Sequence, residues 1–161
     1  MVNIVVVSHS AKLADGVAEL AAQMTQNGCR LVVAAGVDDP DHPIGTDAIK
    51  VMQAIEEVFD PSGVLIMMDL GSALLSTETA LELLDPEMSA RVKACSAPIV
   101  EGTLAAVVAA SAGASLAEVE REAQSALQAK KAQLGEKEPQ AKEMTSESPT
   151  LRSDERGVSW K

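Results

Sequence analysis

The sequence predicts an α/β fold: an open, mostly parallel β-sheet flanked by helices. Apolar runs of strand length alternate with segments of helical apolar spacing, which is the pattern of parallel strands joined by helical crossovers. The expected strands are apolar throughout, as in sheets covered on both faces. Hydrophobic residues make up 47% of the chain but aromatic residues only 1%, so the core must be aliphatic.

The first half of the chain supplies two strand–helix pairs. Residues 2–8 (VNIVVVS) predict a strand, and apolar residues recur with helical spacing over 13–24. Residues 30–36 (RLVVAAG) predict a second strand, and the turn-rich loop VDDPDHPIGTD follows it at 37–47. A helix is expected from Asp47 to Val58, and its predicted apolar face consists of Ile49, Met52, Ile55 and Val58.

The second half continues the alternation. GVLIMMDLG at 63–71 predicts a third strand, and a helix from Ser72 to Leu84 should stop before Pro86. RVKACS at 91–96 predicts a short fourth strand, and Pro98 precedes an alanine-rich helix at 100–112. Ser115 and Glu118 form a capping-box pattern that opens a last helix over 116–134.

The chain consists of two regions that differ in composition. Residues 1–133 are expected to form one folded domain, and residues 134–161 a flexible, disordered linker, because the latter are poor in apolar residues and contain two prolines. Residues 134–161 hold 6 of the 24 acidic and 5 of the 13 basic residues, so the acidity belongs to the folded part.

Charge and cysteine usage exclude several classes of protein. A formal net charge of −11 argues against nucleic acid and anionic membrane as partners. The apolar N-terminal run is too short to span a bilayer and no basic region precedes it, so we expect a cytoplasmic protein. Cys29 and Cys95 have no metal-ligand spacing, and two reduced structural thiols are expected.

Polar residues stand at the ends of the expected strands, which is where functional sites form in parallel α/β sheets. His9 ends the first strand, Asp69 ends the third, and HPIGTD at 42–47 follows the second. Because sites form at the carboxyl ends of parallel strands near the point where strand order reverses, these elements can share one crevice.

Each candidate residue has a structural and a functional interpretation. His9 is either a satisfied polar residue at a strand end or a base, metal ligand or nucleophile. Asp69 either caps the following helix or orients the His9 ring through a hydrogen bond. A metal site from His9, His42 and Asp69 is conceivable, but their spacing matches no recognised ligand pattern, and His42 is typical of a solvated loop residue.

Glycines and hydroxyls near these residues suit a phosphoryl group. Gly71 and Ser72 stand at an expected helix N-terminus, where free backbone N–H groups can hold phosphoryl oxygens, and Gly45 and Thr46 can do the same from the neighbouring loop. The sequence contains no G-x-x-x-x-G-K-[ST], no G-x-G-x-x-G after the first strand and no G-x-S-x-G. P-loop kinases, dinucleotide enzymes and α/β hydrolases are therefore disfavoured.

The ordered set NIVVVSHSAKLADGV, HPIGTD, VLIMMDLGSALLSTETALELL and APIVEG resembles the N-terminal domain of the phosphotransferase (M) subunits of bacterial dihydroxyacetone kinases. More distantly, it is similar to the mannose-family IIA domains of the sugar phosphotransferase system. The resemblance covers about residues 1–130. It implies a mannose-family EIIA-like phosphoryl-carrier domain, a homodimer, and a phosphotransferase component of a phosphoenolpyruvate-dependent dihydroxyacetone kinase.

The resemblance also implies roles for individual residues. His9 would accept a phosphoryl group, by likeness on Nε2, and Asp69 would lie beside its imidazole. Gly45, Thr46, Leu70, Gly71 and Ser72 would form the phosphate environment, with no metal and no permanently bound cofactor. The donor would be the phosphocarrier HPr, charged from phosphoenolpyruvate by enzyme I. The acceptor would be ADP on the kinase's nucleotide-binding L subunit.

Two further implications remain open at this point. Longer members of the family continue into an HPr-like domain, to which the linker at 134–161 would lead. The alternative to a phosphoryl relay is a non-enzymatic α/β ligand-binding or regulatory module in which His9 is a polar contact.

Overall fold

The computed structural model describes residues 1–25 and 28–135. Met1–Lys130 form one compact unit, and Lys131–Lys161 a second, of which only residues 131–135 are described. The linker expected at 134–161 therefore lies outside the described residues from position 136 onward.

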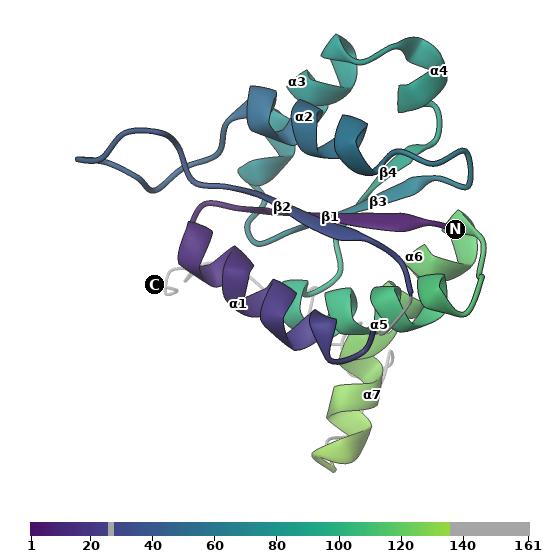
Figure 1. The fold of residues 1–161 in the computed structure, drawn as a ribbon. Helices are drawn as coiled ribbons and strands as arrows, with labels where there is room; N and C mark the ends of the chain where they lie inside the picture. The colour runs from purple at the N-terminus through teal and green to yellow at the C-terminus, as the bar shows by residue number, and fades with distance from the viewer. Residues whose placement is uncertain (26–27, 136–161) are drawn as a thin grey trace, which may run out of the picture. The chain divides into compact units, whose positions relative to one another are not determined.

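A four-stranded parallel sheet occupies the centre of the first unit (Figure 1). The strands are β1 (Asn3–Ser8), β2 (Leu31–Ala35), β3 (Val64–Met68) and β4 (Val92–Cys95). Their order is β2-β1-β3-β4, with all neighbours parallel, which confirms the predicted fold class. The chain moves to β2 on one side of β1 and then crosses to β3 on the other, so strand order reverses between β1 and β3.

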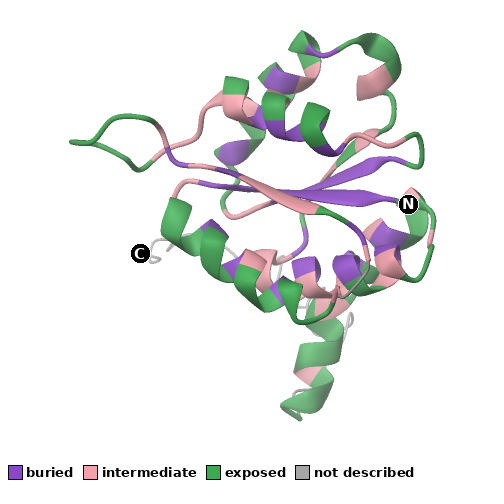
Figure 2. Cartoon of the chain, in the orientation of Figure 1, coloured by how far each residue is buried: buried purple, intermediate pink, exposed green. Residues whose placement is uncertain are grey.

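Helices cover both faces of this sheet (Figure 1). One layer consists of α1 (Ala11–Ala22), α5 (Ile99–Ser111) and α6 (Leu116–Gln124), and the other of α2 (Ala48–Val58), α3 (Ala73–Leu83) and α4 (Pro86–Ser89). Because successive side chains of a strand point to opposite faces, Ile4 and Val6 pack in the first core while Val5 and Val7 pack in the second. All four are fully buried, as the purple central strands in Figure 2 show.

Two helix boundaries differ from the prediction. Pro86 does not merely stop the preceding helix but opens α4, for which Asp85 is the N-cap, because proline is well tolerated in a first helical turn. The single helix expected over 116–134 is divided at Ser125 into α6 and α7 (Ala126–Gln133). The Ser115–Glu118 capping box at the start of α6 is confirmed.

The apolar faces predicted for two helices are partly wrong. In α2 the buried positions are Val51, Ala54, Ile55 and Val58, and Ile49 is 46% exposed. In α1 only Ala14, Val17 and Ala21 are buried, whereas Leu13, Leu20 and, just beyond the helix, Met24 are exposed. Small residues at Ala14, Ala21 and Ala54 let the helix backbones approach the sheet, which leaves the larger side chains at the edge of the contact.

No helix in the described parts of the chain combines the length and apolarity needed to cross a lipid bilayer. Both cysteines are unbonded and buried, and burial raises the pKa of the Cys29 thiol. That placement agrees with the expected structural role of the thiols.

Leu65, in the middle of β3, tests the importance of the sheet core for stability. Its side chain is fully buried in the core beneath α1, α5 and α6, so truncation to alanine leaves a cavity there. We expect Leu65→Ala to lower the free energy of unfolding by about 2–5 kcal/mol, as measured by urea denaturation. Leu75→Ala, at a strongly exposed position, is the matched control and should change it by less than about 0.5 kcal/mol. Equal losses in the two variants would contradict this account of the core.

Candidate functional site

His9 and Asp69 meet at the carboxyl edge of the sheet, where strand order reverses. His9 follows β1 directly and Asp69 follows β3, and these strands are neighbours with Val7 paired to Met68. The Asp69 amide extends this pairing by donating to the Val7 carbonyl at 3.2 Å. The parallel register therefore brings the two residues together although 60 positions separate them in the chain.

The Asp69 carboxylate holds His9 at two points. Its Oδ1 lies 3.0 Å from the ring Nδ1, and its Oδ2 accepts from the His9 backbone N–H at 2.9 Å. A carboxylate only accepts hydrogen bonds, so Nδ1 carries a proton, and in the neutral imidazole the lone pair is then on Nε2. The side chains are 20% exposed at His9 and 8% at Asp69, so the carboxylate is sheltered while the ring stays accessible.

Two further donors complete the environment of Asp69. The hydroxyl of Ser8 donates to Oδ2 at 2.9 Å, and the Leu70 amide donates to Oδ1 at 2.7 Å. Burial by itself raises the pKa of the Asp69 carboxyl. The hydrogen bonds from His9, Ser8 and Leu70 outweigh it, so the pKa lies below its ordinary value. Asp69 is thus an ionised orienting group, and Ser72 rather than Asp69 is the N-cap of α3.

The N-terminus of α3 faces the free nitrogen of His9. The Ser72 Oγ lies 2.8 Å from Nε2 and, with the lone pair on that nitrogen, its hydroxyl is the donor. Ser72 makes no side-chain bond to its own helix. Among the hydrogen bonds of the described residues, none uses the amides of Gly71 or Ser72 as donors. These N–H groups stand at the positive end of the helix, where an anion is favoured.

The loop after β2 forms the other wall of the site. The Gly45 amide donates to the His9 carbonyl at 2.8 Å, with Gly45 at a φ of +149° that favours glycine. Thr46 lies toward α3 instead of His9, since its Oγ1 is 2.6 Å from the Ser76 Oγ. This hydroxyl pair ties the loop to α3.

Of the seven site residues predicted, the structure places six in one connected set around the His9 ring and backbone: His9, Asp69, Leu70, Ser72, Gly45 and, through Ser76, Thr46. Gly71 stands between Leu70 and Ser72, with open space where a Cβ would point. Sequence reasoning missed Ser8 and Ser76. A hydroxyl residue that ends an apolar run and directly precedes His9 is the signal that marks Ser8.

His42 does not join this set. It lies on the exposed loop with its Nδ1 3.7 Å from Asp39. Across residues 1–25 and 28–135, no three His, Cys, Asp or Glu side chains gather as metal ligands would, so His9, His42 and Asp69 do not form the metal site considered from the sequence.

Asp69 makes the stability of the fold depend on pH. Its pKa is lowered in the folded state, so the ionised carboxylate stabilises that state fully above about pH 4, the ordinary aspartate range. As the pH falls through the lower folded-state pKa, the contribution is lost, because the unfolded chain takes up the proton first. We expect the urea midpoint of the wild type to fall further between about pH 5 and pH 3 than that of Asp69→Asn. A difference between the two proteins that does not change with pH would contradict this.

An open parallel sheet with an imidazole and a carboxylate at its switch point defines a small α/β domain suited to carrying a group on histidine. The family model described as the PTS system fructose IIA component (EIIA-man) matches residues 3–120, and the chain belongs to this family.

The chain is similar to phosphoryl donor subunits named DhaM of phosphoenolpyruvate-dependent dihydroxyacetone kinases. It is 58% identical over 161 residues to the DhaM protein of Klebsiella michiganensis, covering 99% of this chain but 34% of that protein. A DhaM protein of Listeria innocua is 37% identical over 108 residues, covering 67% of this chain and 85% of that protein. The chain thus spans about a third of the length of the Klebsiella relative.

A solved structure shares the fold. The crystal structure of a protein of unknown function, EF1359, matches with a TM-score of 0.67 at 33% identity, covering 76% of this chain and 92% of that chain. This agrees with the four-stranded parallel architecture described above.

Proposed function

We propose that this chain is a phosphohistidine relay of the phosphoenolpyruvate-dependent phosphotransferase system, with His9 as phosphoacceptor. The observation that carries the proposal is the contact of the His9 ring with Asp69: Oδ1 lies 3.0 Å from Nδ1, so in the neutral ring the proton is on Nδ1 and the lone pair on Nε2, and the ring is partly exposed. A ring held by a carboxylate on one nitrogen, with only a displaceable hydroxyl on the other, is arranged for nucleophilic attack by that second nitrogen.

The transfer uses few groups. The Nε2 lone pair attacks the phosphorus of a phosphohistidine donor while the bond from that phosphorus to the donor nitrogen breaks. The proton on Nδ1 stays hydrogen-bonded to Asp69, whose negative charge balances the charge that the ring gains. The Ser72 hydroxyl must leave Nε2 for the attack, and it and the amides of Gly71 and Ser72 are then placed to donate to the phosphoryl oxygens.

The similarity to DhaM proteins supports a choice of partners. We propose HPr, charged by enzyme I, as the donor and ADP on the nucleotide-binding L subunit of a dihydroxyacetone kinase as the acceptor. A protein partner is supported by exposed apolar residues in the segments that contact His9: Ile44 next to Gly45 in the loop after β2, Leu70 next to Asp69, and Leu75 in the first turn of α3. The acidic character of the chain favours a partner with a basic surface through electrostatic steering.

Reconstitution tests the proposal directly. The chain is incubated with phosphoenolpyruvate, enzyme I and HPr, each omitted in turn, and its intact mass is measured before and after acid treatment. We expect one acid-labile phosphoryl increment that requires all three components. The phosphorylated chain is then mixed with the L subunit loaded with ADP, and loss of the increment should accompany formation of ATP.

If the chain stays unmodified while HPr is charged, the relay is excluded. The α/β ligand-binding module then becomes the better account of the site. If the chain is phosphorylated but the L subunit does not remove the group, the acceptor assignment alone is wrong.

A further inference from the structure

Among the described residues, Ser8 is the only side chain besides the His9 ring that donates to the Asp69 carboxylate. The other two donors are the backbone N–H groups of His9 and Leu70. Oδ1 accepts from the ring and from Leu70, whereas Oδ2 accepts from Ser8 and from the His9 backbone. Because donors hold both oxygens, they fix the rotation of the carboxylate and therefore the direction in which Oδ1 faces Nδ1.

A second contact fixes the orientation of the Ser8 hydroxyl itself. The Ser10 amide donates to Ser8 Oγ at 3.0 Å, so this oxygen is the acceptor there. Its single proton is then free for Asp69 Oδ2, which lies 2.9 Å away and can only accept. Within residues 1–25 and 28–135 the hydroxyl makes these two hydrogen bonds and none to the His9 ring. Any effect of Ser8 on the ring therefore passes through Asp69.

The backbone of Ser8 is held by the sheet. Ser8 is the last residue of β1 and pairs with Ala35 of β2, and its carbonyl accepts from the Gly36 amide at 3.1 Å. Ser8 is fully buried, and the Asp69 side chain is 8% exposed. Water therefore has little access to replace the hydroxyl if it is removed, which would leave Oδ2 with the backbone N–H of residue 9 alone.

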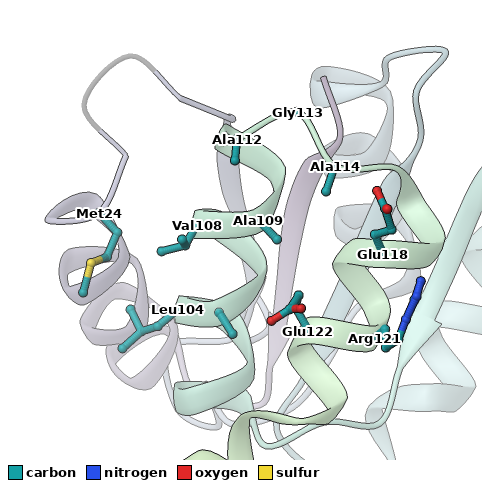
Figure 3. A pocket seen from close by; sticks show the side chains of 11 residues that line it. Met24, Leu104, Val108, Ala109, Ala112, Gly113, Ala114, Glu118, Arg121 and Glu122 are labelled. Carbon is teal, nitrogen blue, oxygen red and sulfur yellow. The ribbon is translucent and has the colours of Figure 1, made fainter.

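The charged side chains of α6 lie away from this contact. Glu118, Arg121 and Glu122 border a groove of about 870 Å³ beside α5, and Figure 3 shows them on α6. The groove lies near the carboxyl ends of α1 and α5, whereas His9 precedes the amino end of α1. These charges are thus too remote to orient the Asp69 carboxylate, and its direction depends on its own hydrogen-bond donors.

We propose that Ser8 is a positioning residue for phosphoryl transfer and acts on His9 through Asp69. The inference rests on the proposed function, since it assigns a group that keeps Nε2 of the phosphoacceptor reactive. One nitrogen of a neutral imidazole carries the proton, and Oδ1 of Asp69 keeps that proton on Nδ1. Without the Ser8 hydroxyl the carboxylate can turn away from Nδ1. Rings with the proton on Nε2 then become populated, and these cannot attack phosphorus.

Ser8→Ala removes the hydroxyl alone. By rapid quench at saturating phospho-HPr, we expect the maximal rate of phosphoryl transfer to fall about 10- to 10²-fold, the range for losing a hydrogen bond to a charged group. The phospho-HPr concentration at half-maximal rate should not change, because Ser8 is buried and cannot contact a partner.

Ser10→Ala is the matched control. It removes a hydroxyl two positions away that accepts from the Leu13 amide at 3.2 Å and caps α1, with no hydrogen bond to Asp69. Because a helix cap acts on the start of the helix, the maximal rate should stay within about twofold of the wild-type rate. An equal loss in Ser8→Ala and Ser10→Ala would assign the effect to the amino end of α1 and overturn the proposal.

A double-mutant cycle separates an action through Asp69 from a general weakening of the fold. If Ser8 acts through the carboxylate, Ser8→Ala should slow transfer much less in an Asp69→Asn background than in the wild type. A purely structural role would lower the rate by the same factor in both backgrounds. Equal factors would therefore contradict the proposal, as would a Ser8→Ala rate equal to that of the wild type.

A spectroscopic measurement gives a result without phosphoryl transfer. In protein labelled with ¹⁵N at histidine, the ring nitrogen shifts report which nitrogen is protonated at a pH where the ring is neutral. We expect the wild type to carry the His9 proton on Nδ1 and Ser8→Ala to show a mixture of both tautomers. An unchanged tautomer in Ser8→Ala would reject the role of Ser8 while leaving the relay intact. A wild type that takes up no phosphoryl group would reject the relay, and the tautomers would still decide whether Ser8 positions Asp69.

Discussion

A His9→Gln variant is expected to gain no phosphoryl increment when incubated with phosphoenolpyruvate, enzyme I and HPr. Asp69 keeps the hydrogen bonds from the backbone N–H of residue 9, the Ser8 hydroxyl and the Leu70 amide, so the carboxylate is not left without partners. Glutamine has no nitrogen lone pair suited to attack on phosphorus, so the proposed chemistry is removed while the local hydrogen bonding is largely preserved. Intact mass spectrometry under neutral conditions gives the measurement.

The second histidine provides the matched control. His42 is exposed on the loop and pairs only with Asp39 among the described residues, so His42→Gln should be phosphorylated as fully as the wild type. Uptake by His9→Gln together with its loss in His42→Gln would move the phosphoacceptor to the loop and contradict our assignment.

Asp69→Asn is expected to slow phosphoryl transfer from phospho-HPr by about 10²- to 10⁴-fold. The asparagine carbonyl oxygen can accept at most two of the four hydrogen bonds that the two carboxylate oxygens now accept from His9, Ser8 and Leu70. If its NH₂ group faces the ring, Nδ1 becomes the acceptor and the proton moves to Nε2, which blocks the attacking position. The charge that balances the phosphorylated ring is lost as well.

Single-turnover transfer, measured by rapid quench, separates slower phosphoryl transfer in Asp69→Asn from weaker binding of phospho-HPr. Asp39→Asn removes the same charge from the exposed loop and serves as the control, because any loss of electrostatic steering should be similar in the two variants. We expect the maximal transfer rate at saturating phospho-HPr to fall only in Asp69→Asn. An equal fall of the maximal transfer rate in both variants would show that Asp69 acts through the overall charge and not on the ring.

The sequence was sufficient for the strand pattern, because continuous apolar runs such as 2–8 and 63–68 can be satisfied only in a sheet covered on both faces. It also placed His9 and Asp69 at one edge, because all strands are parallel and the carboxyl ends of β1 and β3 must then coincide. The break at Ser125 was missed because alanine, glutamine and lysine favour a helix on either side of it.

The missed parts depend on contacts between distant segments. Ser8 was read only as part of a strand, yet its fully buried hydroxyl donates to Asp69 and accepts from the Ser10 amide. Ser76 is an unremarkable helix residue until the loop carrying Thr46 reaches it. The apolar spacing over 13–24 likewise could not predict which positions are buried: Val17 is buried, whereas Leu20 and Met24 are exposed.

The pairing of β1 with β3 determines how long the His9–Asp69 arrangement persists. The two residues extend directly from the central strands, and backbone hydrogen bonds between these strands continue as far as the Asp69 amide. Local openings of a protein begin at helix ends and exposed loops, whereas paired central strands separate only when the whole domain unfolds. Fluctuations in the outer helices therefore leave the His9 ring oriented. In the proposed relay, the domain can then meet one protein after another without rebuilding its reactive centre between encounters.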